Sequence, residues 1–291
     1  MLPDRLIGIL CLGVAGFTAT WGGDASLRAH PRPAALNARQ LGSTSTPASE
    51  VTTTTAGATS TTVAPSTTTS AVASTTTAPA PALSPEETKA LARQGAVVIA
   101  DLPVGFSGSV KAAPADAPAA TDGPFDRCLG PDAGALTAAI GARARSGQFA
   151  RTGSGTVASS SAVFDQPASA EKVMGILDSP AARSCFEGII NARLARNPKL
   201  PENVRGSLTP IGLGPAGDRA TAFRFEVRLP AEDVEQDPPP GEKDVPYLTD
   251  FVFVRRGRVL ALVEFANLRQ PFPAGDAQAV LASLAGHMPA S

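Results

Sequence analysis

The 291-residue chain has few of the side chains on which enzyme chemistry usually depends. It contains two histidines, three cysteines, one tryptophan and one tyrosine. Only His287 falls in the part of the chain that we expect to fold, so Ser-His and Cys-His hydrolase schemes and His-rich metal sites lack their components. We therefore expect no catalytic residue, no metal site and no cofactor, and we expect that the protein is not an enzyme.

Charge and aromatic content argue against two further classes of ligand. Lys and Arg total 25 against 26 for Asp and Glu, so the chain has no broad positive field for a nucleic-acid partner. The single tryptophan, Trp21, ends an apolar N-terminal stretch. Carbohydrate grooves usually stack sugars on flat aromatic rings, so the absence of any later tryptophan argues against carbohydrate binding.

The N-terminus predicts export from the cytoplasm. An apolar stretch from Leu6 to Trp21 follows Arg5, which is the pattern of a secretory signal. Cleavage after Ala25 would suit its small neighbours, but the stretch is also close to the ~20 residues of a membrane-spanning helix. Residues 1–25 are therefore either a signal peptide or a membrane anchor. Leu10 precedes Cys11 where a lipobox needs a small residue, so lipidation is not expected.

Residues 26–83 predict a disordered linker of low complexity. From Gly42 to Pro81 the chain is almost entirely Thr, Ser, Ala, Pro and Val, with Glu50 as the one charged residue. Such a segment buries too little apolar area to offset the entropy of ordering. Hydroxyl residues interleaved with proline also resemble glycosylated stalks, so we interpret the segment as a tether.

Residues 84–291 are long enough to form one domain with a proper core. Apolar periodicity and capping residues predict helices over about 84–94, 169–177, 179–194 and 277–286. Alternating patterns predict two strands within 148–164 and further strands at about 223–229, 248–254 and 259–265. This order of elements predicts an α+β domain, in which helices pack against an antiparallel sheet.

Three charged or glycine-rich motifs have ordinary explanations. Residues 212–217 read G-x-G-x-x-G, but a strand follows them where a nucleotide site needs a helix, so we expect a turn. Six carboxylates between Glu232 and Asp244 predict a solvated loop. Arg255, Arg256 and Arg258 predict an exposed hairpin turn, with contact to an anionic lipid or wall polymer as the alternative.

Cys128 and Cys185 are an even pair in a domain expected outside the cytoplasm, which favours a disulfide. Cys185 falls on the face of the 179–194 helix that we expect to be buried, where a structural disulfide is ordinary. The alternative is two unrelated buried thiols.

The order of several short segments resembles actinobacterial extracytoplasmic domains. These segments are 101–106 (Asp-Leu-Pro-Val-Gly-Phe), Cys128, 157–164, Ser179-Pro180 with Cys185, and 251–259. The pattern is similar to the extracellular sensor domains of mycobacterial receptor kinases and to lipoproteins of PsbP-like fold. The resemblance implies a sheet flanked by helices and a ligand-sensing role. Such sensor domains commonly carry more than one disulfide, and the kinase half is absent here.

Three functions follow from these patterns. The first is a non-catalytic binding or sensing module of the cell envelope, with an apolar or amphipathic ligand in a cleft between sheet and helices. The alternative is a structural or assembly protein that contacts another envelope protein. A carboxylate-based glycosidase is the third. The expected partners are a lipid, a cell-wall ligand or an envelope protein, and the expected location is secreted or anchored at the envelope.

We predict that Cys128 and Cys185 are joined in protein isolated from its native host. Alkylation followed by mass spectrometry should label both thiols only after reduction. Reduction should also lower the free energy of unfolding by roughly 4 kcal/mol on the chain-entropy account of loop closure. Labelling of both cysteines before reduction would contradict the prediction.

Overall fold

The computed structural model describes residues 81–108, 130, 133–153, 155–197, 200–201, 203–231 and 241–290. These residues belong to one compact unit. The predicted export segment, nearly all of the predicted linker, Cys128 and residues 232–240 lie outside the described residues.

The described part of the chain contains an eight-stranded antiparallel sheet, which confirms the predicted fold class. The strands are β1 (Ser107–Gly108), β2 (Ile140–Arg145), β3 (Phe149–Arg151), β4 (Gly155–Phe164), β5 (Gly206–Pro210), β6 (Arg219–Pro230), β7 (Asp244–Arg256) and β8 (Val259–Leu268). Their order is β1-β3-β4-β8-β7-β6-β5, and β2 pairs with β4. The two longest pairings join β6 to β7 and β7 to β8.

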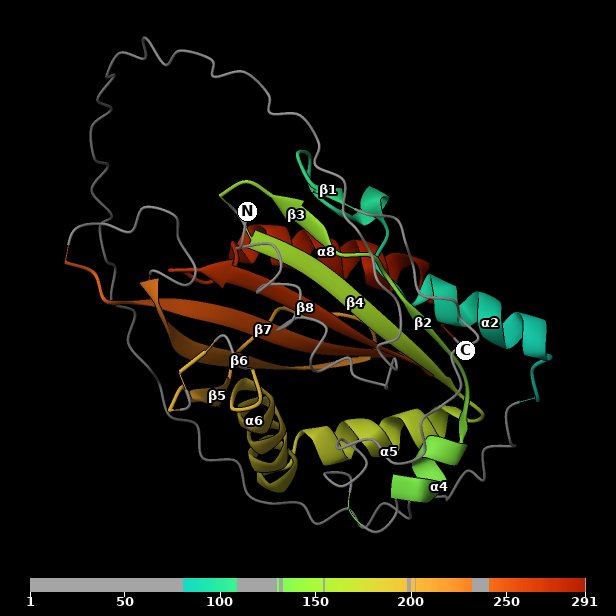
Figure 1. Ribbon diagram of the computed structural model, residues 1–291. Helices are drawn as coiled ribbons and strands as arrows, with labels where there is room; N and C mark the ends of the chain where they lie inside the picture. The colour runs from blue at the N-terminus through green and yellow to red at the C-terminus, as the bar shows by residue number, and fades with distance from the viewer. Residues whose placement is uncertain are drawn as a thin grey trace, which may run out of the picture. The chain divides into compact units, whose positions relative to one another are not determined.

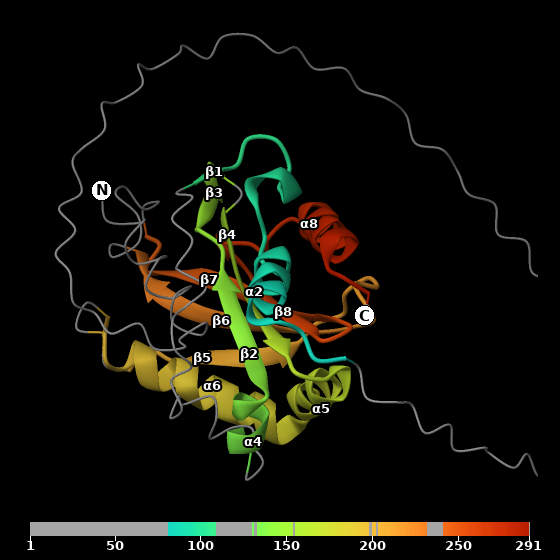
Figure 2. The same cartoon turned by 90° about the vertical axis from the view of Figure 1, so that its right-hand side faces the viewer.

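Helices cover both faces of this sheet (Figures 1 and 2). One face carries α5 (Pro167–Leu177) and α6 (Pro180–Leu194), and we call it the α5/α6 face. The opposite face carries α2 (Pro85–Gln94) and α8 (Ala274–His287), and we call it the α2/α8 face. Two short helices, η1 (Ile99–Asp101) and α4 (Ala133–Ala138), complete the described elements.

Aromatic side chains form the core on the α5/α6 face. The Phe186 ring of α6 meets the Phe251 ring of β7 edge-on, with ring centroids 5.2 Å apart, and the Phe253 ring at 6.2 Å. Met174 of α5 is fully buried in the same cluster. Edge-to-face aromatic pairs add stabilisation beyond their buried area, so Phe186 fixes α6 on the sheet.

Aliphatic side chains form the core on the α2/α8 face. Val280, Leu281 and Leu284 of α8 are fully buried there, as their predicted spacing requires. Helix α2 ends very close to the sheet at Gly95. A Cβ at this position would lie 2.7 Å from Val259 Cγ1, so the close approach requires glycine.

The predicted helix starts are confirmed at two positions. Ser84 forms a capping box with Glu87, whose backbone N–H donates to Ser84 Oγ at 3.3 Å. The Ser84 hydroxyl and N–H both donate to the Glu87 carboxylate and lower its pKa. Ser179 caps α6 by accepting the Ala182 N–H at 3.1 Å. Each cap satisfies backbone donors that have no partner within the helix.

Other details of the sequence prediction were wrong. Helix α8 begins at Ala274, so Asp276 lies in its first turn rather than at its cap, and it pairs with Arg151. Cys185 lies on α6 as predicted, but it is half-buried, because the buried face of α6 is formed by Ala182, Phe186, Ile190 and Leu194. Strands β2 and β5 were not predicted.

Truncation of Phe186 to alanine should destabilise the domain strongly. The variant removes both edge-on ring contacts from a packed core, and such cavities typically cost about 3–5 kcal/mol. Chemical denaturation followed by circular dichroism measures the loss. Ala192, which is exposed on the same helix, provides the control: Ala192→Ser should change the free energy of unfolding by about 0.5 kcal/mol or less.

Candidate functional site

A hollow of about 460 Å³ lies where β5 ends and β6 continues. Pro210, the last residue of β5, pairs with Phe223, so residues 219–222 of β6 extend beyond the end of β5. The connecting residues 211–218 pass beside this extension, and residues 210–222 line the hollow. Its volume is within the range typical of small-molecule sites.

Backbone hydrogen bonds hold the connecting loop at both ends. The Ile211 N–H donates to the Ala222 carbonyl at 3.0 Å, and the Asp218 N–H donates to the Arg255 carbonyl at 2.8 Å. Gly217 has a φ of 61°, and a Cβ there would lie 2.4 Å from the Arg255 carbonyl oxygen. Glycine is therefore required where the loop meets β7.

The wall of the hollow combines apolar and polar groups. Ile211, Leu213 and Ala220 are half-buried and pack against the α2/α8 core, and Ala216 is buried. Polar backbone groups of the glycine-rich loop and the residues Asp218, Arg219 and Thr221 complete the lining. Such a lining matches a ligand with both an apolar and a polar part.

Ion pairs connect the hollow to α5 and β7. Arg219 donates to the carboxylates of Asp178 and Glu171, and these hydrogen bonds, chiefly the one to Asp178, raise the pKa of its guanidinium. Arg255 Nε lies 2.8 Å from the Glu171 carboxylate, and Arg255 also pairs with Asp218 at 3.6 Å. Because these groups are linked in a network, they hold the start of β6, which borders the hollow, more firmly than isolated surface pairs would.

The glycine motif of this loop is a turn, as predicted. It lies between two antiparallel strands, β5 and β6, and no helix follows it. The oriented helix N–H groups that hold a nucleotide phosphate are therefore missing from this loop. The arrangement is suited to binding rather than to phosphate chemistry.

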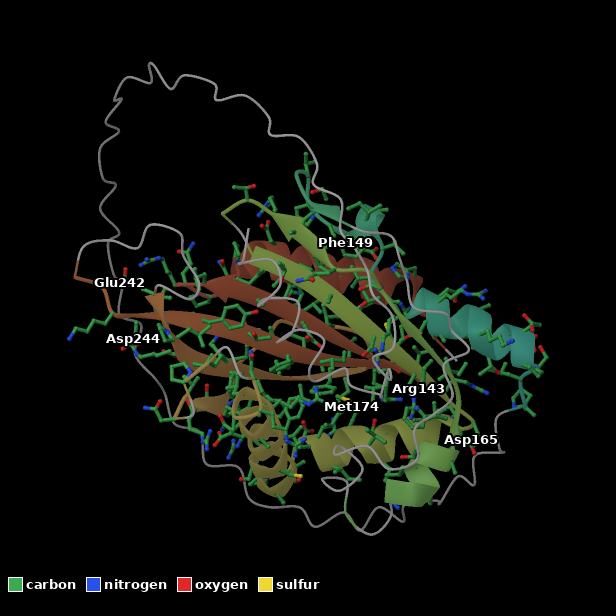
Figure 3. The ribbon with its side chains drawn as sticks, viewed as in Figure 1. Arg143, Phe149, Asp165, Met174, Glu242 and Asp244 are labelled. Carbon is green, nitrogen blue, oxygen red and sulfur yellow. The ribbon has the colours of Figure 1, made fainter. Side chains whose placement is uncertain are left out.

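A second group of charges lies on the α5/α6 face. Glu264 of β8 is 1% exposed and pairs across the sheet with Phe251 of that face. Arg143 and Arg145 of β2 point to the same face, since their partners in β4 are Ala162 and Ser160. Figure 3 shows Arg143 on the side of the sheet that faces α5.

Burial and opposite charge act against each other in this group. Burial lowers the pKa of the Arg145 and Arg193 guanidinium groups, whereas the nearby Glu264 carboxylate raises it in both. Arg193 comes from α6, so the Glu264 carboxylate attracts guanidinium groups from a strand and from a helix. We interpret the group as a structural link between the sheet and α6.

The two buried carboxylates of the sheet, Asp250 and Glu264, do not form a facing pair. Asp250 lies on the α2/α8 face, where Arg224 binds it through two bonds of 2.6 and 2.8 Å. That bidentate contact raises the pKa of the Arg224 guanidinium. Glu264 lies on the opposite face. A glycosidase needs two carboxyl groups about 5–10 Å apart on either side of one bond, and these two are separated by the sheet.

His287 has partners that the sequence did not reveal. Its Nε2 lies 3.0 Å from Asp101 Oδ1, and the Ser283 hydroxyl donates to the same oxygen at 2.7 Å. Asp101 is 7% exposed and also accepts the Val98 N–H at 2.8 Å. Because the aspartate lies between the serine and the histidine, the histidine does not contact the hydroxyl as a base would. The group fastens η1 to the end of α8.

The predicted exposed turn of three arginines was wrong. Arg255 joins the ion-pair network, and Arg256 donates to the Ala285 carbonyl at the end of α8. Arg258 is 3% exposed and donates to the carbonyls of Pro81 and Asp165. All three guanidinium groups thus bind within the domain, and the proposed contact with an anionic polymer loses its basis.

In the described part of the chain, packed side chains occupy the space between the sheet and α6, where we expected a ligand cleft. Between the sheet and α6, the described phenylalanines pack on one another and fill the space. Cys128 lies outside the described residues, so its disulfide with Cys185 stays a prediction. Among the described residues no group of three His, Cys, Asp or Glu side chains is placed to hold a metal ion. No helix in the described ranges is long and apolar enough to cross a membrane.

The sequence matches no protein-family model and no curated protein. Among solved structures it is similar to the extracellular domain of PknH from Mycobacterium tuberculosis, with a TM-score of 0.32 and 9% identity over 71% of this chain and 92% of that chain. That domain is of the kind that the sequence resembles. A likeness of this size carries no argument about ligand or function, and the PsbP-like part of the resemblance stays a prediction.

Replacement of Glu264 by glutamine should destabilise the domain. The change removes the carboxylate that offsets the burial of Arg145 and Arg193. We expect a loss of about 2 kcal/mol, less than for a fully enclosed ion pair, because both arginines are half-buried. Urea denaturation measures it. Glu226→Gln on the exposed part of β6 is the control, and an equal effect of both variants would contradict the structural role of Glu264.

Proposed function

We propose that this chain is a non-catalytic binding or sensing module of the cell envelope, and that its ligand is a small amphipathic molecule held in the hollow at residues 210–222. The mixed lining of that hollow carries the proposal. Ile211, Leu213 and Ala220 offer an apolar wall, and the backbone N–H and C=O groups of the glycine-rich loop offer polar partners. Backbone hydrogen bonds hold this loop at both of its ends.

The envelope location is supported by the sequence. An apolar segment behind Arg5 and a Thr/Ser/Pro-rich linker precede the domain, and the domain has an even number of cysteines. These features belong together in a module that is exported and held at a distance from its membrane or released from it.

The described geometry offers more to a binding module than to an enzyme. Beside the hollow, Arg219 and Arg255 are paired with Glu171, Asp178 and Asp218, so both guanidinium charges are compensated. Neither buried carboxylate of the sheet opens into the hollow, since residues 210–222 alone line it. Recognition by shape and polarity is what this arrangement can perform.

Gly212→Trp tests the proposal with little risk to folding. Gly212 lines the hollow, yet a Cβ there would meet no atom within 4 Å, so a large side chain can occupy the space. We expect native mass spectrometry of the wild-type protein from its own host to show an added small-molecule mass. The tryptophan variant should lose that mass, because its indole ring fills the ligand volume.

Gly188→Trp is the matched control. Gly188 is exposed on α6, and a Cβ there also meets no atom within 4 Å, so the same substitution is made away from the hollow. This variant should keep the bound mass. A wild-type protein without any bound molecule would contradict the proposed ligand site, as would an equal loss of the bound mass from both variants.

A further inference from the structure

Exposed large apolar side chains gather in one short segment of the described chain. Val98 and Ile99 are each 48% exposed and Val104 is 97% exposed, and these three are the large apolar residues that the described residues leave in solvent. All lie within 98–104, around η1. Scattered exposed aliphatic residues are ordinary, but a local cluster marks a contact surface.

The segment turns its one charged residue away from solvent. Between Val98 and Gly108 only Asp101 is charged. Its carboxylate is directed inward to the Val98 N–H, the Ser283 hydroxyl and His287. The segment itself therefore presents aliphatic groups and no charge. The guanidinium of Arg151, which donates to the Val104 carbonyl at 3.4 Å, is paired with Asp276, so little unpaired charge opposes the transfer of the segment out of water.

Further contacts at both ends hold the segment in place. The Val97 N–H donates to Ser159 Oγ of β4 at 2.8 Å, and Val97 itself is 1% exposed. At the other end, Phe106 packs on Phe272 with a centroid distance of 6.1 Å, and the Arg151 guanidinium lies 4.8 Å from the Phe106 ring centroid. The exposed side chains are thus presented by a fixed backbone. In Figure 2 this segment, the blue-green turn between α2 and β1, lies at the far end of the domain from α5 and α6.

The size of the cluster decides between two kinds of partner. A stable protein–protein interface buries about 800 Å² per partner from about 20–30 residues. Three aliphatic side chains fall far short of that area. A few apolar side chains do suffice for contact with a lipid surface when a second attachment holds the protein there, because two weak membrane signals act together.

The preceding chain supplies such an attachment if residues 6–21 are an anchor. A flexible coil of 58 residues, the length of the predicted linker 26–83, would span about 40 Å. That span keeps the domain close to the membrane and raises the effective concentration of the segment there. Arg93, exposed in the last turn of α2, adds a positive charge near the segment for anionic headgroups.

We propose that Val98, Ile99 and Val104 form a lipid-contact site through which the tethered domain rests on the membrane that anchors it. The site shares no residue with the 210–222 hollow, so the two proposals can be tested independently. The three side chains insert among the lipid acyl chains. The carboxylate of Asp101 is buried in the domain and does not contact the lipid.

A tryptophan at position 104 reports the contact directly. The full chain has only Trp21, so Val104→Trp in a Trp21→Phe background gives a single reporter. The chain is reconstituted in phosphatidylethanolamine and phosphatidylglycerol vesicles, with brominated lipids as quenchers. We expect a blue-shifted emission that brominated lipid quenches, and we expect Ile99→Asp in the same chain to abolish the quenching.

Gly188→Trp in the same background is the control and should stay quenchable by aqueous iodide. An equal response of the two reporters would overturn the proposal, as would a Val104→Trp reporter that only iodide quenches. An emission shift of the Val104→Trp reporter that requires added envelope proteins would also overturn it in favour of a protein partner. Circular dichroism of Ile99→Asp establishes that the chain remains folded. If Ile99→Asp unfolds, Val98→Ser replaces it with the same expected loss.

Discussion

The burial of both faces of one antiparallel sheet is the constraint on which the rest of the structure depends. Val252 and Val254 of β7 point to α8, whereas Phe251 and Phe253 point to α6. A strand in this position has no face exposed to solvent, so every polar group on it needs a partner within the protein. The two buried carboxylates of the sheet satisfy this requirement on opposite faces, each among arginines.

The same constraint moves any binding surface to the margins of the sheet. Buried side chains pack between the sheet and its helices in the described residues. The hollow lies where β5 stops before β6, and the exposed aliphatic cluster lies where the chain leaves α2. Each feature is fixed by an aspartate that accepts a backbone N–H. Asp218 accepts the Gly257 N–H at 2.7 Å, and Asp101 accepts the Val98 N–H. Short irregular segments thereby become rigid without a core of their own.

Local patterns in the sequence were enough to predict the elements whose signals are local. Ser84 with Glu87 and Ser179 with Pro180 mark the helix starts, since a cap involves only residues three apart. The alternation in β6 and the hairpin of β7 and β8 were likewise predictable. Strand β2 was missed because alternating Ala and Arg have little strand preference, and it is a strand only because β4 pairs with it. Strand β5 was missed because it begins with glycine and ends with proline, which are depleted in strands, and it is a strand because β6 pairs with it.

The sequence by itself determined the fold class, most helix and strand positions, and the turn at the glycine motif. Only the tertiary structure decided which partner each charged side chain contacts. Arg255, Arg256 and Arg258 are neighbours in the chain, yet they reach α5, the end of α8 and the carbonyl of Pro81. His287 and Asp101 are 186 residues apart and meet at one oxygen. Periodicity reports which face a residue occupies, whereas its partner depends on which distant segment packs there, and that is a property of the whole fold.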